Sequence, residues 1–295
     1  MAPVNAQKSK ALFDRALLRR RRGRAARSKG EAFLQTHIAN SAAERVLDIH
    51  KNFDNGLIFA APKFAQTFLN KAGHKFANIC VMDDTDAHHL VDISGQETAL
   101  PFVDQKFDFV LNGLTLHMAN DPVLALNAFA RVLKPDGFFM ACLFGGQTLN
   151  ELRQVFYKTE DMFFGRMTPR IIPMIPLQAA AGLLQSAPFA MPVVDRDILR
   201  VNYKNIDGLI RDIRESGDTN VMTERMRFPL SRQFKAILST NYQADFSNAN
   251  GKLTATFETI WLSAWAPHPD QPKPLKPGSA KMRLADALGV KEIKT

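Results

Sequence analysis

The sequence predicts an α/β protein in which helices cover both faces of a mostly parallel sheet. Short apolar runs suited to buried strands alternate with segments of helical spacing, which is the pattern of parallel βαβ units. Residues 107–146 hold a strand, a loop, a capped helix, a tight turn and a second strand in immediate succession. With 295 residues, 46% of them hydrophobic and 23% charged, the chain can form a sizeable core.

The positive charge of the chain is concentrated in an N-terminal arm. Residues 1–29 contain ten lysines and arginines against the single acidic residue Asp14, a balance of +9 that equals the net charge of the whole chain. Helical spacing predicts an amphipathic helix over residues 11–27, which include four consecutive arginines. Such a helix suits solvent, an anionic membrane surface or an acidic partner. Nucleic acid is disfavoured, because no aromatic residues interleave with the basic run.

The first half of the sheet is expected between residues 31 and 111. An approximate apolar stripe predicts a helix over residues 31–53. A continuous apolar run predicts a buried strand over residues 56–61, and Pro62 opens the next helix. Two further buried strands are expected, at residues 78–82 and 107–111.

The second half of the sheet follows a capped helix. Asp121 can cap this helix, since Pro122 stands at its first position, where the missing N–H costs nothing. The sequence LKPDG at residues 133–137 ends the helix, and Gly137 is expected to adopt a positive φ. Beyond this turn we predict a strand at residues 138–144, helices at residues 148–156 and 177–185, and strands at residues 193–201 and 254–265.

A proline-rich tail is expected after the last strand. Residues 268–280 carry four prolines and predict an extended segment, with a short helix near residues 282–288. We therefore divide the chain into a basic arm with its helix (residues 1–52), an α/β domain (residues 53–266) and a tail (residues 267–295).

Cysteine usage and hydropathy limit the compartment. Cys80 and Cys142 lie in apolar, strand-like contexts, which favours reduced thiols over a disulfide framework. No apolar run reaches the roughly 18 residues of a spanning helix, and the N-terminus lacks the apolar region of a secretory signal. An arginine-rich, acid-poor N-terminus also suits a mitochondrial transit peptide.

Motifs spread over nearly the whole chain resemble one family closely. They are FDR at residues 13–15 before the arginine run, LPF at 100–102, LH at 116–117, ND at 120–121, LKPDG at 133–137, FGGQTLNELR at 144–153, VNY at 201–203, and QPKP and PGSA at 271–274 and 277–280. This set resembles the methyltransferase-like proteins related to the mitochondrial complex I assembly factor that hydroxylates an arginine of a complex I subunit. Its bacterial relatives are usually described as class I methyltransferases.

The resemblance implies a class I methyltransferase (Rossmann-like) fold with a seven-stranded sheet, and action on a protein partner. It also assigns the FDR motif and the basic run to the mature protein, which weakens the transit-peptide interpretation. We therefore expect a bacterial cytoplasm, or the mitochondrial matrix if the source is eukaryotic.

The resemblance further implies an S-adenosylmethionine site at the carboxyl ends of the strands. The family's first strand would lead into a glycine-rich loop, but this chain has Ala60, Ala61 and Pro62 there, and the proline fixes φ and removes an N–H. The acidic residue common near the end of that strand is replaced by Ile58. The expected cofactor site is therefore degenerate.

Several positions of this expected site keep polar side chains or open backbone. Asp83 or Asp84 could accept hydrogen bonds from ribose hydroxyls, or could end a strand in solvent. Gln96 would contact adenine. The cofactor-binding candidates are Ala60, Ala61, Asp83, Asp84, Gln96, Asn112 and Gly113, the last two lying where open α/β sheets bind ligands.

His117 is the catalytic candidate, either a substrate-facing base or ligand or a packing histidine. Glu151 and Tyr203 could face the same crevice or serve structural roles. His88 and His89 lack a third ligand at suitable spacing, so no metal site is expected.

Two functions remain open at this point. The first is an S-adenosylmethionine-dependent methyltransferase-like protein that acts on a protein partner, in complex I assembly or arginine modification. The alternative is a non-catalytic assembly or adaptor protein that keeps the fold with a degenerate cofactor site.

Overall fold

A seven-stranded sheet forms the centre of the computed structural model, which describes residues 11–227 and 229–272. The strand order is β3-β2-β1-β4-β5-β7-β6, and β7 runs antiparallel to both of its neighbours while the other pairs are parallel. The strands are β1 (Phe53–Ala60), β2 (Phe76–Asp83), β3 (Ile93–Ser94), β4 (Phe107–Gly113), β5 (Leu133–Phe144), β6 (Ala190–Tyr203) and β7 (Leu253–Trp265). The predicted mostly parallel, seven-stranded α/β fold is confirmed.

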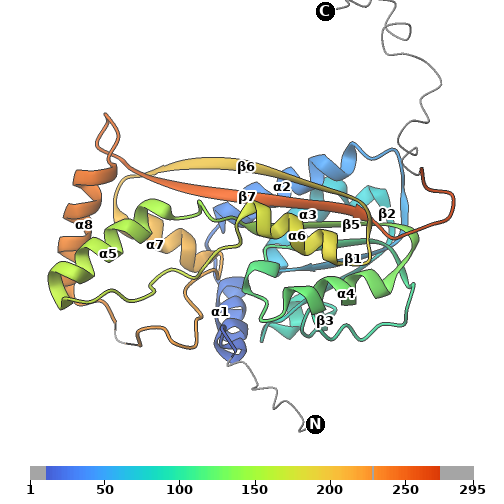
Figure 1. Ribbon diagram of the computed structural model, residues 1–295, viewed down its shortest axis with the longest axis horizontal. Helices are drawn as coiled ribbons and strands as arrows, with labels where there is room; N and C mark the ends of the chain where they lie inside the picture. The colour runs from blue at the N-terminus through green and yellow to red at the C-terminus, as the bar shows by residue number, and fades with distance from the viewer. Residues whose placement is uncertain (1–10, 228, 273–295) are drawn as a thin grey trace, which may run out of the picture.

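Helices cover both faces of this sheet (Figure 1). One face carries α2 (Phe33–Leu47) and α3 (Pro62–Ala72), with α5 (Asn150–Phe164), α7 (Ile206–Glu215) and α8 (Arg232–Phe246) toward one end. The other face carries α4 (Pro122–Val132) and α6 (Leu177–Ser186). The remaining helices are α1 (Arg15–Arg27) and the short 3₁₀ turns η1 (Gly73–Lys75), η2 (His88–Leu90) and η3 (Leu116–Met118).

The strands divide their side chains between two cores. In β5, Met140 and Cys142 join the cluster beneath α2 and α3, whereas Phe139 and Ala141 join the cluster beneath α4 and α6. This alternation follows from the two-residue period of a strand. Because both faces are covered, β5 is apolar without interruption from Phe138 onward, as predicted for a doubly buried strand.

From residue 11 onward, the basic arm is part of the folded body. Asp14 caps α1 by accepting a hydrogen bond from the Leu17 N–H at 3.0 Å. Just before the helix, Phe13 pairs as an antiparallel bridge with Met222, and Asn120 exchanges two hydrogen bonds with the Phe13 backbone. The arm is therefore tied to two distant segments before the arginine run begins.

Two local predictions differ clearly from the structure. The helix predicted over residues 31–53 ends at Leu47, because Phe53 is the first residue of β1 and packs in its core. The positive φ of the LKPDG turn falls on Asp136 (58°), and a Cβ at Gly137 would lie 2.8 Å from the Lys134 carbonyl oxygen. Gly137 is therefore needed because the backbone of Lys134 lies too close for a side chain, and not because of its φ. The helix predicted near residues 282–288 lies outside the described residues.

Candidate functional site at the carboxyl edge of the sheet

The carboxyl ends of β1, β2 and β4 bring the predicted cofactor residues to one edge of the sheet. Ala60 pairs with Gly113 across β1 and β4, and Asp83 ends β2 beside Ser94 of β3. Open α/β sheets bind ligands at this edge. The strand register thus places these predicted residues at the expected end of the fold.

The loop after β1 is filled by apolar side chains. Pro62 is the first residue of α3, and Phe64 on the same helix is fully buried. A Cβ added at Gly113 would lie 2.7 Å from the Phe64 ring and 2.8 Å from the Ala60 Cβ. The glycine is therefore needed for close packing of β4 against α3 and β1.

Arginines of α1 bind the two aspartates at the end of β2. Arg22 Nη1 lies 2.9 Å from Asp83 Oδ1, and the Asp84 carboxylate lies 2.7 Å from both Arg15 Nη2 and Arg19 Nε. Both aspartates are fully buried. The interpretation that they end the strand in solvent is wrong, because α1 covers them.

Sequence reasoning missed a third carboxylate in this cluster. Arg15 binds Glu97 through two parallel contacts, Nη1 to Oε1 at 2.8 Å and Nη2 to Oε2 at 2.7 Å. Glu97 is buried and adjoins Gln96, the predicted adenine contact, which is only partly buried. The sequence did hold one sign of such a cluster. Arginines at positions 15, 19 and 22 lie on one side of a helix and could together face several carboxylates.

The close approach of α1 depends on its glycine. A Cβ at Gly23 would fall 1.5 Å from Asp86 Oδ1 and 3.3 Å from the Ala87 backbone nitrogen. At the end of the helix, Arg27 pairs with Asp86 at 3.0 Å. The arginine run therefore lies directly against the segment that follows β2.

His117 is buried in η3, where its ring contacts Phe144 edge-on at a centroid distance of 5.2 Å. Neither ring nitrogen has a hydrogen-bond partner among the described residues. Burial, and secondarily the Arg22 cation, lower the pKa of His117 to about 3. At neutral pH its imidazole is therefore uncharged and packed.

Asp218 is another ionisable group near Arg22, and Asn112 is a buried polar group at the end of β4. Burial raises the pKa of Asp218 to about 7, although the Arg22 cation opposes this shift. Asn112, at the end of β4, is fully buried and donates a hydrogen bond to Thr115 Oγ1 at 2.5 Å. Arg22 Nη2 also lies 3.4 Å from the Leu114 carbonyl oxygen.

The remaining predicted residues are structural or unclustered in this conformation. Glu151 accepts two hydrogen bonds from Thr256, and Tyr203 packs in the core beneath α7 and α8. Within residues 11–227 and 229–272, no group of three or more His, Cys, Asp or Glu side chains could hold a metal ion. Cys80 and Cys142 are free thiols whose pKa burial raises, to about 11 and about 12.

Comparison with known proteins assigns the chain to a family. Residues 63–141 match a family described as a methyltransferase domain. The chain is 31% identical over 290 residues to the mitochondrial arginine-hydroxylase NDUFAF5 of Rattus norvegicus, covering 93% of this chain and 83% of that protein. The Homo sapiens protein of the same name is 30% identical over 286 residues, with 93% and 83% covered. The chain belongs to the family of these NDUFAF5 proteins.

Solved structures agree with the fold of this arginine-hydroxylase family member. A Bacillus halodurans protein assigned as a methyltransferase aligns with a TM-score of 0.51 at 13% identity, covering 77% of this chain and 98% of that one. The YcgJ protein of Bacillus subtilis gives the same TM-score at 16% identity, with 79% and 99% covered. These likenesses concern the fold alone.

The FGGQTLNELR motif, which carries much of the family resemblance, fixes α5 to β7. A Cβ at Gly145 would lie 2.6 Å from the Glu258 side chain, whose carboxylate accepts the Gln147 N–H at 2.8 Å. Thr148 Oγ1 donates to the Glu258 carbonyl oxygen at 3.0 Å. The motif thus has a structural role here.

No helix in the described part of the chain has both the length and the apolar character of a membrane span.

Proposed function

We propose that this chain acts on a protein partner in the assembly of a respiratory complex, and that it does so without S-adenosylmethionine at the carboxyl edge of its sheet. The observation that carries the proposal is the ion pair between Arg22 and the fully buried Asp83. It supports a structural use for a carboxylate that would otherwise be open to a ribose. Respiratory-complex assembly is what the resemblance to the arginine-hydroxylase family implies.

The loop after β1 supports the same proposal. A dinucleotide- or nucleoside-binding loop needs bare backbone that a ligand can approach closely. Pro62 removes a backbone donor here, and Phe64 and Ala60 fill the space beside Gly113. These residues do not fit S-adenosylmethionine.

Equilibrium dialysis against radiolabelled S-adenosylmethionine tests the cofactor part of this proposal. We expect no saturable binding to the full chain at ligand concentrations up to about 1 mM, which is the upper end of typical KM values. One bound equivalent per chain at micromolar concentration would overturn it. Restoring glycine at positions 60 and 62 should leave the biological role unchanged, measured as NADH:ubiquinone oxidoreductase activity in membranes of cells lacking the native gene.

A second candidate function is S-adenosylmethionine-dependent modification of the partner protein. The match to a methyltransferase domain over residues 63–141 favours it. Asp83 and Asp84 also stand where ribose acceptors are expected, so α1 would have to leave before they could bind a cofactor. In that case the Arg22→Met variant should bind S-adenosylmethionine more tightly than the wild type, because the competing cation is gone.

We propose that the arm contacts an acidic surface of the partner protein. Arg20 and Arg24 of α1 are exposed while Arg15, Arg19 and Arg22 are occupied by carboxylates of the same chain. Crosslinking from a photoreactive residue at position 20 should identify the partner. We propose a bacterial cytoplasm or a mitochondrial matrix as the compartment, the relatives named above being mitochondrial.

A further inference from the structure

A cavity of about 680 Å³ lies between α1, α5, α7 and the segments that connect them. Asp83, Asp84 and Glu97, the carboxylates bound by α1, do not line it. Its volume falls within the roughly 300–1,000 Å³ of small-molecule sites. It is thus a second place in this fold where a ligand could be held.

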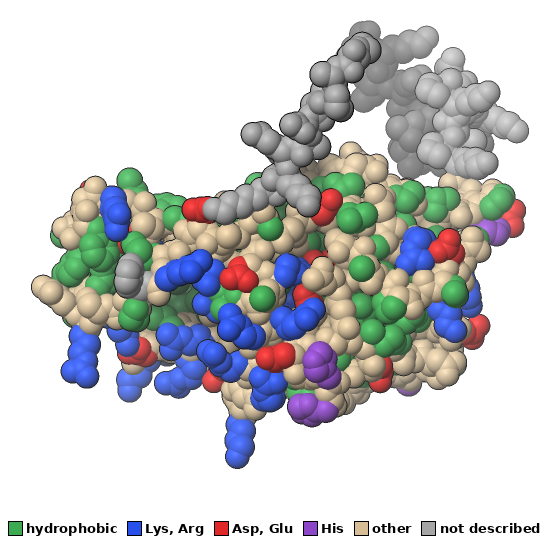
Figure 2. All heavy atoms as spheres, turned by 90° about the horizontal axis from the view of Figure 1, so that it is seen from below, with side chains coloured by type: hydrophobic (Ala, Val, Ile, Leu, Met, Phe, Trp, Pro, Cys, Tyr) green, Lys and Arg blue, Asp and Glu red, His purple; other side chains and the backbone are tan. Residues whose placement is uncertain are grey.

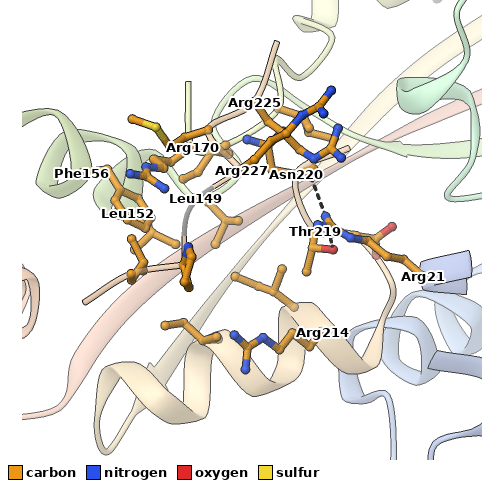
Figure 3. A pocket seen from close by; sticks show the side chains of 18 of the residues that line it. Arg21, Leu149, Leu152, Phe156, Arg170, Arg214, Thr219, Asn220, Arg225 and Arg227 are labelled. Atoms are coloured by element: carbon orange, nitrogen blue, oxygen red, sulfur yellow. Dashed lines mark hydrogen bonds between the residues drawn. The ribbon is translucent and has the colours of Figure 1, made fainter. Parts of the chain in front are cut away.

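One part of the cavity wall is apolar. Leu149, Leu152 and Phe156 contribute from the start of α5 (Figure 3). Ile210 and Ile213 contribute from α7. Burying apolar ligand surface against such a wall is favourable by about 25 cal/mol per Å². A purely polar anion would leave this part of the wall unused.

The rest of the lining is rich in arginine. The described lining residues include six arginines and one acidic residue, Asp218. Figure 3 shows Arg170, Arg225 and Arg227 close together, with Arg214 on α7 across the cavity and Arg21 reaching in from α1. The lower face of the molecule carries many lysine and arginine side chains and fewer acidic ones over the same region (Figure 2).

Most of these guanidinium groups lack an anionic partner within the described chain. Arg170 pairs with Glu160 at 2.5 Å and Arg225 with Asp14 at 3.4 Å. Within the described residues, the hydrogen bonds of Arg21 go to neutral oxygens, those of the Thr219 side chain and the Asn220 backbone. No ion pair of Arg24, Arg214 or Arg227 is recorded among residues 11–227 and 229–272.

The arginines of the cavity also destabilise one another. The pKa of Arg21 is lowered by burial and by the cations of Arg225 and Arg24. An anion placed among them would relieve this repulsion, and arginine binds carboxylate and phosphate through paired N–H donors. The geometry and charge therefore call for a ligand with an anionic head and an apolar body.

We propose that the cavity binds a single-chain amphipathic anion, with a carboxylate or phosphate monoester head among Arg21, Arg24 and Arg214 and an alkyl chain along the walls of α5 and α7. A neutral lipid would leave the arginines uncompensated. Inorganic phosphate would leave the apolar wall unused. This inference does not depend on the proposed assembly function. Arg24 belongs to both surfaces, but this proposal rests on the lining of the cavity, whereas the proposed function rests on the ion pair between Arg22 and Asp83.

Isothermal titration of the full chain with monomeric amphiphiles tests the proposal. Decanoate and decyl phosphate are titrated below the onset of micelle formation, with decanol and inorganic phosphate as matched half-ligands. We expect saturable binding of about one equivalent of decanoate, decyl phosphate or both, with both half-ligands at least tenfold weaker. A preference for decanoate indicates a free fatty acid, and a preference for decyl phosphate indicates a phosphate-bearing lipid.

Variants locate the head group. Arg214→Gln and Arg24→Gln should each weaken binding about tenfold, as expected for loss of one charged hydrogen bond. Their controls are Arg211→Gln on α7 and Arg20→Gln on α1, which are exposed arginines of the same helices that do not line the cavity. Circular dichroism confirms that each variant is folded. Because the two variants lie on different helices, the test still stands if one of them fails to fold.

The absence of saturable binding of either anionic amphiphile would overturn the proposal. Equal binding of decanol, or equal weakening by the control variants, would overturn it as well. Binding to phosphatidylglycerol vesicles without binding of the monomeric amphiphiles would also overturn it, and would assign the arginines to a membrane surface.

Discussion

A buried carboxylate destabilises a fold unless a cation and hydrogen bonds compensate its lost hydration, and for Asp83 that cation is Arg22. Burial raises the pKa of Asp83 while Arg22 opposes the rise. Both side chains are almost completely inaccessible, at 4% and 0% exposure. Exposed ion pairs of similar length contribute far less to stability. A buried and an exposed ion pair of α1 can therefore be compared directly.

Replacing Arg22 by methionine should destabilise the protein strongly. We expect a loss of about 3–5 kcal/mol in the free energy of unfolding, since the variant leaves a buried charge unpaired. Urea unfolding measures the change. Arg27→Met is the matched control, because its ion pair with Asp86 is partly exposed and should be worth about 0–1 kcal/mol. Equal losses in the two variants would contradict the assignment.

Asp218 should make stability fall as the pH rises. Its pKa in the folded state is about 7 against an ordinary 3.8, so its contribution is complete below about pH 4 and is lost as the pH passes 7. Relative to Asp218→Asn, the wild type should therefore lose at most about 1.4 kcal/mol per pH unit over this window. The control is Asp161→Asn at an exposed position of α5, and the same slope in that variant would contradict the assignment to Asp218.

His117 should act in the opposite direction. Its pKa of about 3 in the folded state lies below the ordinary 6.5, so its contribution is present above pH 6.5 and is lost as the pH falls toward 3. His117→Leu should gain about 2 kcal/mol relative to the wild type between pH 8 and pH 5. Chemical unfolding at both pH values measures this. An equal gain in the His74→Leu variant, at an exposed position, would contradict the assignment to His117.

At the scale of elements, α1 is the unit that closes the carboxyl edge. Its cap residue Asp14 and its arginines contact segments that are 59 to 211 positions away in the sequence. Local helix propensity alone would not hold a helix of 13 residues in place. Long-range ion pairs and the cap must therefore contribute.

Removing the cap should loosen this helix selectively. Asp14→Ala is expected to cost about 1 kcal/mol and to speed amide hydrogen exchange throughout α1. Asp121→Ala removes the equivalent cap of α4, whose side chain accepts from the Leu124 N–H, and should leave exchange in α1 unchanged. If exchange in α1 rose equally in both variants, the effect would be global and not local to the cap.

The elements were predictable to different degrees. Buried parallel strands such as β1 and β4 were found because uninterrupted apolar runs identify them. The two-residue strand β3 was missed, since it is too short to show a pattern. The packing of α1 was also missed, because periodicity shows which side chains share a face but not which distant carboxylates they meet. The arginine cavity joins several separate segments and left no local signal.

At the scale of the whole molecule, the charge balance of the sequence acquires a structural meaning. Residues 30–295 are neutral overall, yet they bury Asp83, Asp84 and Glu97 at one edge of the sheet. The arm supplies Arg15, Arg19 and Arg22 to exactly this region of the molecule. The positive arm therefore neutralises buried carboxylates of the same chain, and other arginines of the arm remain on the surface.

Deleting residues 1–29 should remove the cooperative thermal unfolding transition, because three carboxylates would lose their cations together. Calorimetry measures the transition. Replacing the carboxylates by Asn, Asn and Gln in the truncated chain should restore part of it, since neutral amides are less costly to bury. A truncated chain that melts like the wild type would show that the arm is dispensable for folding.

The arginines of α1 fall into two stripes, one at positions 15, 19 and 22 on the carboxylates and one at positions 21 and 24 on the cavity. Binding equilibria at the two stripes are therefore linked through one rigid helix. An anion held by Arg21 and Arg24 must make α1 harder to lift from Asp83. By reciprocity, any nucleoside that displaced α1 from Asp83 would weaken that anion's affinity by the same factor, so the two ligands would be antagonists.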